Sequence, residues 1–128
     1  RALLRNLATS VVLYEKVNPR YAGVTTREGP PNIAAIRGGL DSIRRHLDYL
    51  GRLADDRRWL AGDQFTWADL AAAAQLSAID YIGDVPWAHN EPAKTWFMRI
   101  KSRPSFRAIL ADLIPGVAPA RHYTALDF

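Results

Sequence analysis

A threonine and an aspartate three residues apart are the first candidates for chemistry in this chain. Thr66 and Asp69 could act as a hydroxyl–carboxylate catalytic pair, but their spacing is also that of a helix capping box with aspartate in the place of glutamate. Because an alanine-rich apolar run follows Asp69, we interpret the pair as the cap of a central helix. Phe65 and Leu70 flank it at the spacing of a hydrophobic staple. Truncating Thr66 or Asp69 is expected to cost about 0.5–2 kcal/mol.

The remaining titratable side chains show no catalytic or metal-binding spacing. His46, His89 and His122 lie far apart, and the chain has no cysteine, which excludes thiolate metal sites and cysteine nucleophiles within it. We expect His46 on a helix surface and the other two histidines in loops. Asp80 lies on an apolar helix, so it needs a hydrogen-bond or ion-pair partner unless it belongs to a functional site. We therefore assign no catalytic residue and no metal ligand.

Hydrophobic residues at helical spacing predict the elements that position these side chains. The predicted helices run from 1 to about 17, from 32 to about 59, from about 67 to 82, from about 90 to the Arg103–Pro104 break, and from there to Pro115. No segment shows the alternation of a strand. The predicted fold class is all-α, a bundle of about five helices over residues 1–115. Residues 116–128 form a tail without core periodicity.

Three glycines lie inside the long second helix: Gly38, Gly39 and Gly51. Each costs about 1 kcal/mol relative to alanine in a helix interior. We expect them to permit the close approach of another backbone.

The whole chain carries a net charge of +4, and along the long helix arginines and aspartates alternate every four residues. The two series are Arg37–Asp41–Arg45 and Arg44–Asp48–Arg52. Such ladders are typical of a solvated helix face. The alternative is a docking face for an acidic protein, with Arg44, Arg45 and Arg52 as candidates. Nucleic acid is not expected as a partner, because its binding needs positive charge gathered on one face.

Polar residues interrupt the best apolar run, so no membrane span is predicted and a cytoplasmic location is expected. The chain begins without methionine and within a helical pattern. We therefore expect it to be the second half of a longer protein.

The C-terminal residues 121–128 are rich in aromatic side chains. The tail could fold back over the bundle. Alternatively, it is an exposed recognition element in which Tyr123, Leu126 and Phe128 anchor a partner.

A run of eleven consecutive residues carries a family resemblance: Leu60-Ala61-Gly62-Asp63-Gln64-Phe65-Thr66-Trp67-Ala68-Asp69-Leu70. With the alanine-rich helix, Trp96 and Arg103-Pro104-Ser105-Phe106, it resembles the C-terminal helical domain of glutathione S-transferases. The resemblance implies that the N-terminal thioredoxin-like domain, which supplies the catalytic residue and most glutathione contacts, is absent here. The chain alone is then not expected to be catalytic or to hold a cofactor, and glutathione would belong to a full-length parent. The resemblance also implies an electrophile pocket, with Leu7, Val11 and Tyr14 as candidates unless they are core.

Further stretches resemble one subgroup, the FtsZ-binding, glutathione-transferase-like division proteins of alphaproteobacteria. They are Tyr14-Glu15-Lys16-Val17, Trp59-Leu60-Ala61-Gly62-Asp63, the segments 76–87 and 100–107, and the ending His122-Tyr123-x-x-Leu126-Asp127-Phe128. The subgroup implies an interaction module, an acidic FtsZ partner and a homodimer in the full-length protein. The alternatives are the electrophile-site domain of a working glutathione S-transferase, or a helical scaffold with neither property.

Overall fold

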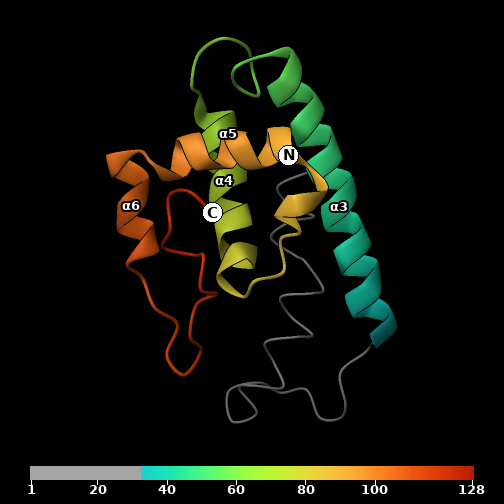
Figure 1. The fold of residues 1–128 in the computed structure, drawn as a ribbon, viewed down its shortest axis with the longest axis vertical. Helices are drawn as coiled ribbons and strands as arrows, with labels where there is room; N and C mark the ends of the chain where they lie inside the picture. Colours follow the sequence, from blue (N-terminus) through green and yellow to red (C-terminus); the bar gives the residue numbers. More distant parts are fainter. Residues whose placement is uncertain (1–32) are drawn as a thin grey trace.

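The computed structural model describes residues 33–128, and four α-helices make up most of them (Figure 1). They are α3 (Ile33–Asp56), α4 (Trp67–Tyr81), α5 (Glu91–Lys101) and α6 (Pro104–Leu110), with the 3-10 turn η2 (Trp87–His89) before α5. The predicted all-α class is confirmed. The expected first helix, with Leu7, Val11 and Tyr14, lies outside the described residues. None of the described helices is long and apolar enough to cross a membrane.

Helix α3 packs against α5, and Ile43, Leu47 and Leu50 of the hydrophobic stripe that the sequence predicts are buried. At Gly51 a Cβ atom would overlap the carboxamide of Asn90, the N-cap of α5. Gly51 therefore does permit a close approach, but of the Asn90 side chain and not of the backbone that was predicted. The predicted close approach is wrong for Gly38, where a Cβ would meet no atom within 4 Å.

Helix α4 runs through the middle of the bundle (Figure 1), which explains its alanine-rich, nearly uniform apolar surface. Its side chains at Ala73, Leu76 and Ile79 are completely buried. Helix α3 ends three residues earlier than predicted, at Asp56, because a tight turn follows it. In that turn the backbones of Trp59 and Gly62 exchange two hydrogen bonds, and the indole of Trp59 enters the core.

The segment after α6 folds back beside α4 and contributes to the core (Figure 1). The hydroxyl of Tyr81 donates to the carbonyl of Val117 at 2.7 Å, and the N–H of Ala120 donates to the carbonyl of Tyr81 at 2.8 Å. Val117 and Tyr123 are both buried. The residues that the sequence separates as a tail are thus packed as part of the same unit, because irregular backbone can bury side chains without helical periodicity.

Candidate functional site

The buried side chain of Asp69 connects three segments of the chain. It therefore does more than cap a helix, which is the role predicted for it. It forms the capping box with Thr66 at the start of α4, where the Thr66 hydroxyl accepts the N–H of Ala68. One carboxylate oxygen accepts from the Thr66 N–H at 3.0 Å and the Thr66 hydroxyl at 3.2 Å. The other accepts from the Leu60 N–H and the Trp96 indole N–H, both at 2.9 Å. Four donors therefore occupy this carboxylate, and it holds the loop before α4 and helix α5 in place.

The flanking staple residues, Phe65 and Leu70, are both half-buried and packed against the core. The ring of Phe65 meets Trp59 edge-on, with the ring centroids 5.2 Å apart. Both staple residues therefore help to fix the start of α4.

Asp80 finds the partners that its position on an apolar helix requires, and they come from elements far away in sequence. One oxygen accepts from the indole N–H of Trp87 and from Nε2 of His122, each at 2.7 Å. The other lies 3.8 Å from the Nζ of Lys101, and both of these side chains are fully buried. His122, expected in a loop with no base beside it, thus binds a carboxylate that is distant in sequence.

Lys101 connects α5 to the segment after α6. Its ammonium donates to the carbonyl of His122 at 3.0 Å and lies 4.3 Å from the centroid of the Phe128 ring, a cation–π geometry. Burial lowers the pKa of Lys101, and the Asp80 carboxylate opposes that shift. Sequence reasoning missed this lysine. The one feature of the sequence that could have indicated its burial is that it follows Ile100 directly, on a helix with an apolar inner face.

The tail residues proposed as partner anchors differ in their exposure. Tyr123 is buried, and its hydroxyl lies 3.2 Å from that of Ser77, so its assignment as an exposed anchor is wrong. It is buried because α4 and α6 leave a space that the returning tail fills. Burial raises the pKa of Tyr123. Leu126 and Phe128 are half-buried against the core and keep part of their surface accessible.

The arginines proposed for a docking face, Arg44, Arg45 and Arg52, are all exposed on α3. Their ion pairs do not follow the predicted ladder, in which partners are four residues apart. Arg44 pairs with Asp41 three residues earlier, at 2.9 Å, while Asp48 turns to His89 at 2.9 Å. Because α3 and the returning tail lie on different sides of α4 (Figure 1), the two groups of candidates form separate surfaces.

Of the other two histidines, His46 lies on α3 and His89 contacts it. His46 is half-buried, where the sequence suggested a surface position, and burial together with the charge of Arg45 lowers its pKa. His89 and Asn90 hydrogen-bond to Asp48 and lower the pKa of that carboxyl group. These contacts fasten η2 and the start of α5 to α3.

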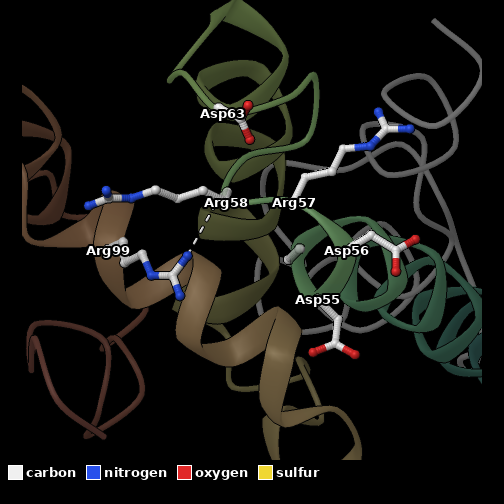
Figure 2. Close-up of a pocket in the computed structure, with 7 residues that line it drawn as sticks. Asp55, Asp56, Arg57, Arg58, Asp63 and Arg99 are labelled. Carbon is white, nitrogen blue, oxygen red and sulfur yellow. Dashed lines mark hydrogen bonds between the residues drawn. The ribbon is translucent and has the colours of Figure 1, made fainter.

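A surface hollow of about 460 Å³ lies where α3 ends, and sequence reasoning did not identify it. It is lined by Ala54, Asp55, Asp56, Arg57, Arg58, Asp63 and Arg99. Figure 2 shows that these charged side chains point away from one another, apart from Arg99, whose Nη1 donates to the carbonyl of Arg58 at 3.1 Å. The charged groups do not converge on one point as a nucleophile and its base would.

The family model described as "Glutathione S-transferase, C-terminal domain" matches residues 33–112. The chain is 51% identical over 123 residues to "FtsZ-localized protein A" of Caulobacter vibrioides (strain NA1000 / CB15N). The aligned region covers 96% of the chain and 52% of that relative. The chain therefore spans about half the length of this relative.

Solved structures that are similar over the whole chain include the following three. The one described as FzlA from C. crescentus has a TM-score of 0.85 and 47% identity, and the match covers 58% of it. A glutathione S-transferase from Rhodospirillum rubrum F11 has a TM-score of 0.82 and 41% identity, with 60% of it covered. A glutathione S-transferase from Sinorhizobium meliloti 1021 has a TM-score of 0.78 and 39% identity, also with 60% covered.

Proposed function

Because this chain belongs to the family of glutathione S-transferase C-terminal domains, we propose that it is the interaction module of a bacterial cell-division protein whose partner is FtsZ. The observation that carries the proposal is the similarity to FtsZ-localized protein A, which extends over nearly the whole chain. The full-length protein would add a thioredoxin-like domain before this one, form a homodimer and act in the cytoplasm.

The use of polar groups supports a binding role over a catalytic one. Both carboxylate oxygens of Asp69 and one of Asp80 are occupied by hydrogen bonds that hold the fold together, and the second oxygen of Asp80 faces Lys101. The exposed arginines of α3 and the accessible parts of Leu126 and Phe128 remain for contacts with a partner. An acidic filament would be attracted to those arginines and would bind less strongly at high salt.

Co-sedimentation of the full-length protein with FtsZ filaments tests the proposal. We expect pelleting at low salt that weakens as salt is raised. Arg45→Glu should reduce it, whereas Arg107→Glu, the same charge reversal at an exposed position on α6, should not. Leu126→Ser tests the tail surface in the same assay. If the protein stays in the supernatant at low salt, the proposal is wrong.

A second function is favoured by the similarity to two structures described as glutathione S-transferases. In that case the full-length protein conjugates glutathione to an electrophile, and this chain supplies part of the electrophile pocket. The test is the rate of conjugation by the full-length protein with several standard electrophiles. Inactivity with all of them would contradict this second function and leave the first unaffected.

A further inference from the structure

An aromatic pocket lies open at the end of the bundle where α4 begins. Phe65, Thr66, Trp67 and Leu70 line a cavity of about 350 Å³. Trp67 is 82% exposed, the largest exposed fraction of any large hydrophobic side chain among the described residues. An indole left this open forgoes the burial that usually stabilises tryptophan, and tryptophan is among the residues that most often dominate binding interfaces.

One arginine, Arg103, lies against this pocket, and Arg58 and Arg99 line the hollow at the end of α3. The guanidinium carbon of Arg103 lies 4.1 Å from the centroid of the Phe65 ring. Arg99, four residues earlier on α5, is fixed by its hydrogen bond to the carbonyl of Arg58. Within residues 33–128 the ion pairs belong to other groups, so Arg58, Arg99 and Arg103 form none with the described part of the chain. Their guanidinium groups retain free N–H donors.

The negative charges nearby do not cancel this arrangement. The hollow that holds Arg58 and Arg99 is also lined by Arg57 and by three carboxylates, those of Asp55, Asp56 and Asp63. Figure 2 shows Arg58 and Arg99 on one side of the hollow and Asp55 and Asp56 on the other. Arg58, Arg99 and Arg103 therefore place positive charge on the α5 side, which we call the rim, while Asp55 and Asp56 lie on the opposite side of the hollow.

We propose that this surface, the Phe65–Trp67–Leu70 pocket with its rim of Arg58, Arg99 and Arg103, binds an acidic linear peptide that carries an apolar anchor residue. The anchor side chain enters the pocket and covers the Trp67 indole. Two or three peptide carboxylates pair with the guanidinium groups, whose paired N–H donors match a carboxylate. Since Arg99 and Arg103 are already held by contacts of their own, they lose little freedom on binding.

The pocket chemistry favours a peptide over a single-stranded nucleic acid, which could also stack on Trp67. A nucleic acid needs a continuous positive track for its phosphates. Here Asp63, Asp55 and Asp56 interrupt such a track within the hollow. A short peptide needs only the rim. The site is separate from the α3 arginines and the tail, so it does not depend on the proposed binding of FtsZ.

Fluorescence anisotropy of a fluorescein-labelled peptide, Gly-Asp-Glu-Leu-Phe-Asp-Glu, mixed with the full-length protein tests the proposal. We expect saturable binding that weakens with salt. Replacing its acids by Asn and Gln, or Leu-Phe by Ser-Ser, should weaken binding at least tenfold. Trp67→Ser and Arg103→Glu should each do the same, whereas Arg107→Glu should change it less than twofold. Thermal unfolding of Trp67→Ser should match that of the parent, because the indole is exposed.

Acrylamide quenching of the free protein, compared with Trp67→Phe, measures whether Trp67 is accessible in the full-length chain. The other tryptophans of this chain are buried, so the difference between the two proteins reports on Trp67. We expect strong quenching that the peptide suppresses. The proposal is overturned if Trp67 is already shielded from acrylamide in the free protein. If dilution restores quenching, a second copy shields it; if dilution does not, another part of the same chain does. The proposal is also overturned if an oligouridine binds and the peptide does not, or if neither variant affects peptide binding.

Discussion

Asp69→Ala should destabilise the protein far more than the loss of a helix cap. The substitution leaves the Leu60 N–H and the Trp96 indole N–H without an acceptor in the interior. Each unsatisfied buried donor costs about 1–3 kcal/mol, so the two together cost about 2–6 kcal/mol. The lost capping interaction adds about 0.5–2 kcal/mol. We expect a total of about 3–6 kcal/mol, because neighbouring groups relax and water reaches part of the site.

Thr66→Ala is the matched comparison, since it removes the hydroxyl of the same capping box and leaves the Leu60 and Trp96 bonds intact. Its expected cost is about 0.5–2 kcal/mol. Asp63→Ala, at an exposed position six residues earlier, should change stability by less than about 0.5 kcal/mol. Urea unfolding followed by tryptophan fluorescence and circular dichroism gives the three free energies.

A loss as large as 6 kcal/mol would exceed the stability of some domains. Asp69→Asn covers the case in which the alanine variant does not fold. Asparagine keeps one oxygen acceptor and turns the other into a donor, so it should lose the bonds at one oxygen and fall between Thr66→Ala and Asp69→Ala. If both Asp69 variants unfold at the same urea concentration as Thr66→Ala, Asp69 is only a cap, and the reasoning from its four hydrogen bonds is refuted.

Gly51→Ala should destabilise the protein because its methyl group would overlap Asn90, whereas Gly38→Ala should stabilise it by about 1 kcal/mol; thermal unfolding of both variants checks the opposite signs. Lys101→Met should cost about 3–5 kcal/mol in urea unfolding, because it removes the buried ammonium that faces the second oxygen of Asp80. Adding Asp80→Asn should restore part of that loss, and no restoration would contradict the ion pair. The folded-state pKa of Asp48 lies below its ordinary value of 3.8, so the contribution of Asp48 to stability is present above that pH and is lost as pH falls through the folded pKa. Asp48→Asn should therefore flatten the acid limb of a stability–pH curve, and an unchanged limb would contradict this.

Sequence reasoning located the helices well where the signals were local. Helix α4 begins at the predicted residue because Thr66 caps it, and α5 begins after Asn90, whose side chain accepts the N–H of Ala93. Both signals lie within four residues of the boundary that they set. The end of α3 was predicted less well, because the turn that ends it depends on Trp59 entering the core.

The long-range partners could not be predicted from periodicity. Asp69 and Trp96 are 27 residues apart, and Asp80 and His122 are 42 apart. An aspartate on an apolar helix indicates that a partner exists, but helical spacing does not identify it. For the same reason the sequence did not decide between a tail folded back over the bundle and an exposed one: the burial of Tyr123 depends on the path of a non-helical segment, which leaves no repeating pattern.

The return of the chain after α6 has a consequence for synthesis in the cell. Val117 and Tyr123 complete the core, and Lys101 and Asp80 have their partner His122 in the same late segment. Domains generally fold from the N-terminus while the ribosome extends the chain. Here a nascent chain that already contains α3 to α6 still exposes Lys101 and Asp80, which the late segment buries in the finished protein. Ribosome-bound chains should therefore stay open to proteases and chaperones until residue 123 has left the exit tunnel.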